Sequence, residues 1–154
     1  MIKKFITTFL FFLLPVTTFA FEDLENLIKQ NERPPGVVIE ITSGDPLYLK
    51  KIIKELQNDI DKLQKKFKDL PVAIVSHARE SLLLAKEETK KHKGFENQIK
   101  TLANDDNTTV HVCGTYASWF NVSEEEFPDY ISVSPAGPVQ VDDYTDLGYI
   151  LIEL

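Results

Sequence analysis

The sequence of 154 residues has little of the residue types that bind metals or form cross-links: one cysteine, Cys113, and three histidines. A single cysteine cannot form an internal disulfide, so the hydrophobic core must supply the stability. His111 and Cys113 would share one face of a strand, and His77 could join them as a third ligand for copper or zinc. No His-x3-5-His or Cys-x2-Cys spacing supports such a site. We therefore predict no metal and no resident cofactor.

Basic residues are absent from the last third of the chain. No Lys or Arg follows Lys100, whereas ten Asp and Glu residues lie between Ala103 and Leu154. Without the first twenty residues, the chain carries 15 basic against 24 acidic residues. Such a surface repels phosphate groups, so we expect no binding to nucleic acid or to anionic membranes.

Long hydrophobic runs are also absent, except at the N-terminus. There Lys3 and Lys4 precede the apolar stretch 5–15, and Thr18-Phe19-Ala20 offers small residues at the positions that signal peptidases require. The stretch is shorter than the roughly 20 residues that span a bilayer. We predict a signal peptide over residues 1–20 and an exported mature protein, periplasmic or secreted, with no membrane anchor.

The mature chain alternates between strand and helix patterns. Residues 21–36 are predicted to be an N-terminal arm and linker, and residues 37–154 a single domain. The predicted strands are Val37–Thr42, Val72–Ser76, Val110–Cys113, Tyr130–Ser134 and Tyr149–Glu153. An apolar stripe from Leu49 to Phe67 predicts a long helix, with Ser43 to Pro46 as its capping turn. Strands that alternate with helices indicate an α/β domain with a mostly parallel five-stranded sheet.

The remaining segments give weaker patterns. Phe95 to Leu102 predicts a second helix. A loop with a short helical piece is predicted for Ala78–Gly94, and a short helix or loop for Tyr116–Phe120. A rigid loop is predicted for Pro135–Pro138, and a helical turn for Asp142–Leu147.

Ligands of open α/β sheets bind outside the carboxyl ends of the strands. Four groups of residues are predicted there: Thr42–Asp45, His77, Cys113–Tyr116 and Ser134–Gly137. The first group contains Ser43 and Asp45, and the third contains Gly114, Thr115 and Tyr116. Cys113 has two interpretations. It is either a small core residue, since free cysteine is often buried, or a reactive thiol whose pKa is depressed by a helix N-terminus or a histidine. His111 is predicted to be a hydrogen-bonded core histidine.

From Pro35 to Leu154 the chain resembles the DsrE/DsrF-like sulfur-relay family. The resemblance rests on V-V-I-E-I-T with the long helix after it, on Ala73–His77, on V-H-V-C-G, and on S-P-A-G-P-V-Q-V-D-D-Y-T-D-L-G-Y-I near the C-terminus. It implies a three-layer α/β/α fold, a tendency to form homo- or hetero-oligomers, and a persulfide on Cys113. Ala78 stands where the family often has glycine, and export sets this chain apart from the well-understood members, which are cytoplasmic.

Two functions follow from these patterns. The first is a thiol-based sulfur carrier, or a protein that binds sulfur compounds, with Cys113 as the reactive residue. His77, Gly114, Thr115, Tyr116, Ser43 and Asp45 are its predicted supporting residues, and a homo-oligomer and a sulfur donor or acceptor protein are its predicted partners. The second is a non-catalytic binding or interaction module in which Cys113 is structural and Tyr116, Trp119 and Tyr144 line a pocket.

Overall fold

Five parallel strands form one sheet at the centre of the protein. The computed structural model describes residues 19–154, so residues 1–18 of the predicted signal peptide lie outside the described residues. The strand order is β4-β3-β2-β1-β5, and all four neighbouring pairs are parallel. The strands are β1 (Val37–Ile41), β2 (Val72–Ser76), β3 (Thr108–Cys113), β4 (Ser132–Ser134) and β5 (Ile150–Glu153). The predicted α/β fold is confirmed, with a sheet that is parallel throughout.

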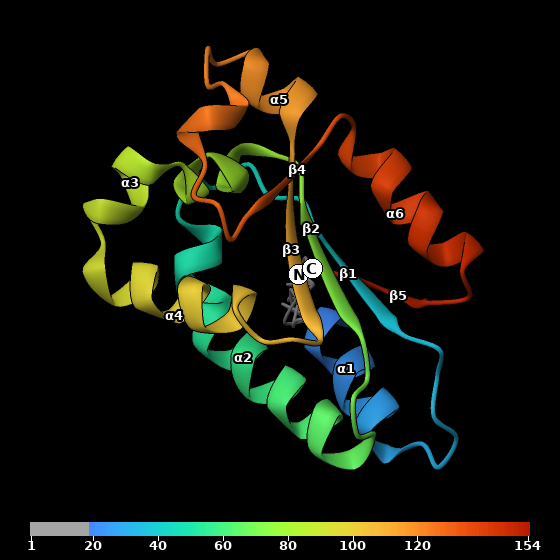
Figure 1. The fold of residues 1–154 in the computed structure, drawn as a ribbon. Helices are drawn as coiled ribbons and strands as arrows, with labels where there is room; N and C mark the ends of the chain where they lie inside the picture. Colours follow the sequence, from blue (N-terminus) through green and yellow to red (C-terminus); the bar gives the residue numbers. More distant parts are fainter. Residues whose placement is uncertain (1–18) are drawn as a thin grey trace, which may run out of the picture.

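Helices cover both faces of this sheet (Figure 1). Helices α1 (Phe19–Lys29), α2 (Tyr48–Lys66) and α4 (Lys93–Ala103) lie on one face, and α6 (Gly137–Asp146) lies on the other. This division follows from right-handed crossovers. The chain steps from β1 through to β4 in one direction, and it returns across the sheet to β5 by way of α6. The fold is therefore a three-layer α/β/α sandwich.

The long helix α2 packs on the sheet through the apolar stripe that the sequence predicts. Leu49, Ile53 and Leu56 are buried in the main core together with the residues of β1 and β2. The helix begins at Tyr48, although proline is favoured at the first position of a helix and Pro46 was therefore expected there. The Asp45 side chain accepts the Leu47 N–H at 3.0 Å, and this local turn delays the first helical residue.

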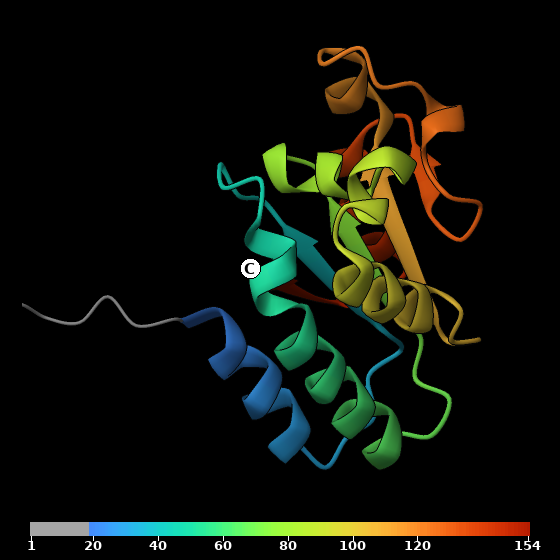
Figure 2. The ribbon, with the colours of Figure 1, turned by 90° about the vertical axis from the view of Figure 1, so that its left-hand side faces the viewer.

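The N-terminal helix α1 is part of the core. Leu24 and Leu27 are buried in the main apolar cluster, and α1 lies beside α2 (Figure 2). Pro34 to Gly36 then lead into β1. Residues 21–36 therefore combine a packed helix with a short connection, and their helical part is not a detached arm.

The connection after β2 is more helical than predicted. It contains a 3-10 helix, η1 (Arg79–Leu84), and a short helix, α3 (Lys86–Lys90). The prediction for Pro135–Pro138 is wrong, because α6 already begins at Gly137. Pro138 is tolerated at the second position of this helix because the first N–H groups of a helix have no partner within it.

Two smaller elements complete the chain. They are α5 (Gly114–Ser118) and the 3-10 helix η2 (Glu124–Glu126), which Ser123 caps reciprocally with Glu126. Within residues 19–154, none of the helices combines the length and hydropathy needed to cross a membrane.

Candidate functional site

The candidate site lies where β3 and β4 end beside each other. Cys113 is the last residue of β3 and is in register with Ser134, the last residue of β4. The chain continues from β3 into α5 and from β4 into α6. Thr115 joins the two exits, because both its N–H (3.2 Å) and its hydroxyl (2.6 Å) donate to the Pro135 carbonyl. Neighbouring strands whose connections diverge in this way form the ligand crevice of open α/β sheets.

Cys113 is buried at this edge, with 5% of its surface exposed. Its Sγ accepts the backbone N–H of Tyr116 at 3.3 Å and caps the start of α5. This contact places a hydrogen-bond donor directly beside the sulfur. The low exposure, in contrast, is typical of a core cysteine. The geometry thus gives one observation for each interpretation of this residue.

His77 follows β2 and lies close to the N-terminus of α6. A Cβ atom on Gly137 would overlap the His77 side chain, so the helix can approach only because this residue is glycine. The hydrogen bond of the His77 ring goes to Glu40, with 2.6 Å between Nε2 and Oε1. The structure therefore gives the ring of His77, which was predicted as a supporting residue of Cys113, a carboxylate partner. Glu40, in the middle of β1, carries no sequence signal for this role.

Gly114 and Tyr116 border the sulfur on the α5 side. A Cβ atom on Gly114 would lie 3.1 Å from Val133 Cγ1 and 3.3 Å from the Ser134 carbonyl. The close approach of β4 therefore constrains this position. The Tyr116 ring packs against Phe120 and Trp119, with centroid separations of 5.2 and 5.6 Å.

Ser43 and Asp45 belong to a separate corner of the same edge. They follow β1, which lies two strands and therefore about 10 Å across the sheet from β3. Ser43 Oγ accepts the Asp45 N–H at 3.2 Å, and the Asp45 carboxylate pairs with Lys51. The hydrogen bond from Lys51 lowers the pKa of Asp45. These contacts shape the turn into α2 and do not reach Cys113.

Glu80 is a buried carboxylate that sequence reasoning missed. Its side chain is fully buried and accepts three hydrogen bonds, from Ser43 N (2.8 Å), Ser76 Oγ (2.9 Å) and Ala78 N (3.1 Å). These bonds tie the exit of β1 to the exit of β2. Glu80 lies in a polar stretch that reads as a solvated loop, so the sequence offers no signal for its burial.

His111 is a hydrogen-bonded core histidine, as predicted. Ser134 Oγ donates to Gln140 Oε1 at 2.9 Å, so the 3.1 Å contact between His111 Nδ1 and Ser134 Oγ needs Nδ1–H as the donor. His111 Nε2 then accepts the Tyr144 hydroxyl at 2.9 Å. Burial lowers the pKa of His111 and raises that of Tyr144, which keeps both side chains neutral. Across residues 19–154, no three His, Cys, Asp or Glu side chains gather at metal-binding distances.

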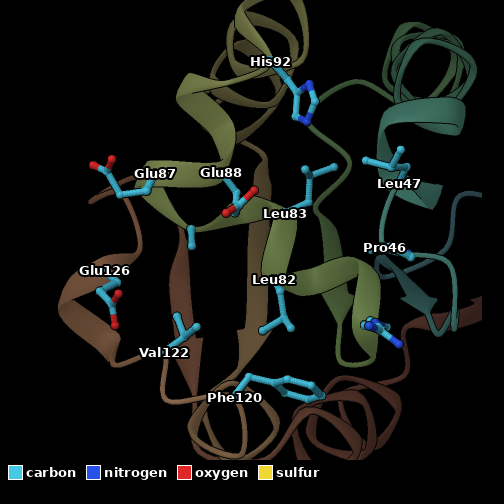
Figure 3. Close-up of a pocket in the computed structure, with 12 residues that line it drawn as sticks. Pro46, Leu47, Leu82, Leu83, Glu87, Glu88, His92, Phe120, Val122 and Glu126 are labelled. Carbon is cyan, nitrogen blue, oxygen red and sulfur yellow. The ribbon is translucent and has the colours of Figure 1, made fainter.

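A pocket of about 610 Å³ opens at the same edge, beyond the ends of β1 and β2 (Figure 3). Neither Cys113 nor the predicted trio Tyr116, Trp119 and Tyr144 lines it. Tyr144 lies instead on α6, where it is bound to His111 and its ring packs 5.0 Å from that of Tyr149. The structure therefore separates Tyr144 from Tyr116 and Trp119, which pack against each other.

Comparisons with known proteins relate this chain to others through the fold alone. No family model and no curated protein sequence matches it. Two solved structures match over 77% of the chain. One is a protein of unknown function, MTH1491 from Methanobacterium thermoautotrophicum, with a TM-score of 0.61, 13% sequence identity and 97% of that chain covered. Another is the ychN protein from E. coli, with a TM-score of 0.59, 12% sequence identity and 99% of that chain covered. YchN has a DsrE-like fold, so the family resemblance seen in the sequence is supported at the level of the fold.

Proposed function

We propose that this protein is a thiol-based sulfur carrier in which Cys113 holds a persulfide. The observation that carries the proposal is the placement of the only thiol at the β3–β4 edge, where Sγ accepts the Tyr116 N–H. This contact places a hydrogen-bond donor beside the sulfur that would act as the nucleophile in sulfur transfer. The DsrE-like fold agrees with this role, although fold alone does not determine function.

The proposed reaction needs no cofactor. The Cys113 thiolate attacks the outer sulfur of a donor persulfide, R–S–SH. A bond forms between Sγ and that sulfur, the S–S bond of the donor breaks, and R–S⁻ leaves. Attack by an acceptor thiolate on the outer sulfur of the Cys113 persulfide then returns the Cys113 thiolate. No net oxidation occurs in either step.

The burial of Cys113 sets a condition on this reaction. With 5% of the residue exposed, a donor reaches the sulfur only after the chain around it moves. We propose that the five-residue helix α5 moves, because it follows Cys113 directly and carries exposed residues such as Thr115 and Ser118. Short surface elements of this kind open at low cost in free energy.

We further propose that the carrier is exported and assembles with itself. The predicted signal peptide over residues 1–20 supports export. Exposed apolar side chains, with Trp119 at 70%, Leu147 at 68% and Val139 at 56%, support an interface between copies or with a donor protein.

The burial of Cys113 and the separate pocket favour a second candidate, a binding module with a structural cysteine. Alkylation of the folded protein across a range of pH, followed by incubation with a persulfide donor, distinguishes the two. The carrier should be alkylated while it is folded and should gain the mass of one sulfur atom. Cys113→Ser should abolish both results.

The double variant Cys113→Ser/Ser118→Cys is the matched control. It places an exposed thiol at the end of α5, away from the Tyr116 N–H, and shows how much alkylation exposure alone produces. Reaction of Cys113 only after denaturation would contradict the carrier and leave the binding module.

A further inference from the structure

The pocket near the ends of β1 and β2 is built from three separate stretches of chain. Pro46 and Leu47 come from the turn after β1, the residues from Arg79 to His92 come from the connection after β2, and Phe120 and Val122 follow α5. In Figure 3, Leu82 and Leu83 occupy the middle, Leu47 lies to one side, and His92 and Phe120 mark opposite ends. Its volume of about 610 Å³ is typical of small-molecule sites.

The inner surface of this pocket is mainly apolar. Leu82 is half-buried and Leu83 buried, and Ala85 and Val122 extend the same surface. Leu47 and Phe120 are 40% and 45% exposed, although both are large apolar side chains. A ligand with a hydrocarbon body would remove these side chains from water, which is favourable at roughly 25 cal/mol per Å².

The acidic residues around the pocket already have partners. Lys90 binds Glu87 at 2.8 Å and Lys91 binds Glu88 at 2.6 Å. The Glu126 carboxylate accepts the Ser123 N–H at 2.7 Å. The lysine partners offset the charges of Glu87 and Glu88, whereas Glu126 keeps its charge and is held at the start of η2 by the capping contact.

Arg79 is the contrasting group. Its backbone N–H donates to the Ser43 carbonyl at 3.1 Å, but within residues 19–154 its guanidinium has no hydrogen-bond or ion-pair partner. A guanidinium offers five donors in a planar fork that suits a carboxylate.

His92 adds a second donor at one end of the pocket. Its Nδ1 lies 3.2 Å from the Lys50 ammonium group, which can only donate, so Nδ1 must accept. The neutral ring then carries its proton on Nε2.

We propose that this pocket binds a small carboxylate with an apolar body, its hydrocarbon part on Leu82, Leu83 and Phe120 and its carboxylate on Arg79. The site is separate from the thiol, because Cys113 does not line it. The proposal therefore stands or falls independently of sulfur transfer.

Calorimetric titration with three ten-carbon probes, each below its micelle concentration, tests the charge preference. Decanoate should bind with one site per chain, decanol more weakly, and decyltrimethylammonium least. Arg79→Gln should weaken decanoate binding at least about tenfold, because a charge-assisted hydrogen bond is lost, and should leave decanol unchanged. Arg79→Lys should retain part of the affinity.

Four further variants locate the binding site. Lys54→Gln removes a positive charge from the exposed face of α2 and should leave decanoate affinity unchanged. Phe120→Ala should weaken both decanoate and decanol, whereas Trp119→Ala, at the neighbouring exposed residue that does not line the pocket, should weaken neither. Cys113→Ser should bind decanoate as the wild type does. Tighter binding of the cation, absence of decanoate binding, or equal affinity in Arg79→Gln would each overturn the proposal.

Discussion

At the scale of single residues, the histidines beneath α6 are held by hydrogen bonds to other side chains. His111 bonds to Ser134 and Tyr144, whereas His77 bonds to Glu40. These side chains are near Cys113 in the fold, but none of their hydrogen bonds goes to sulfur among the residues described. Within residues 19–154, the only hydrogen bond of the thiol comes from the backbone of α5. The Cys113 sulfur is therefore in hydrogen-bond contact with the backbone and not with a neighbouring acid or base of this part of the chain.

His111 should make stability depend on pH. Burial holds its folded-state pKa below the ordinary value of about 6.5. As the pH falls through that value, the unfolded chain binds a proton that the folded protein does not. The free energy of unfolding should therefore decrease between about pH 7.5 and 5.5. Urea unfolding across this range should show a smaller decrease in His111→Gln than in the wild type.

His92→Gln is the matched control, because His92 is a partly exposed ring at the surface. This variant should retain the decrease that is due to His111. An unchanged pH dependence in His111→Gln would show that His111 does not titrate differently on folding.

At the scale of the elements, regular apolar patterns explain what the sequence predicts well. The strand Val72–Ser76 is found with the predicted bounds, and β1 ends one residue early at Ile41. Helix α2 is predicted from its apolar stripe, because seven apolar residues at helical spacing all lie on one face of a helix. The start of α6 is missed because Pro135 to Pro138 has the composition of a loop. Gly137 is required by the nearby His77, a residue sixty positions earlier, and no local pattern can show this.

Gly137→Ala should destabilise the protein. The new methyl group would overlap His77 and push the N-terminus of α6 away from the sheet. Overpacking of this kind costs about 1–3 kcal/mol in the free energy of unfolding, which urea denaturation would measure.

Gly94→Ala is the control, because a Cβ atom there meets nothing within 4 Å and the residue lies in the first turn of α4. It should be neutral or stabilising by up to about 1 kcal/mol. Equal stability of the two variants would mean that α6 can shift without strain.

At the scale of the whole molecule, the candidate site spreads along one edge of the sheet in three parts. The thiol lies at the β3–β4 end, Glu80 joins the exits of β1 and β2, and the apolar pocket lies beyond these exits. Parallel strands bring these parts to one edge, and this convergence is predictable from strand order. The side chain or backbone group that each of these residues contacts is not predictable in this way, because it depends on contacts between residues far apart in sequence.

Removal of α1 should weaken the whole domain. A chain that begins at Pro34 lacks Leu24 and Leu27, which fill the surface of α2 and are fully or almost fully buried. Loss of two buried leucines should reduce the free energy of unfolding by about 3–6 kcal/mol relative to a chain that begins at Phe21. Urea unfolding of the two chains provides the measurement, and equal midpoints would contradict a core role for α1.

The pairing of β1 with β5 has a consequence for how the protein folds. Val37 is in register with Ile150, so more than a hundred residues separate these partners in the chain. Contacts between such distant residues form late, because a large loop must first close. Until then, one side of β1 presents unpaired N–H and C=O groups, which can pair with the edge of another chain. Refolding should therefore be slow and sensitive to concentration, with β5 protecting the sheet only at the final step.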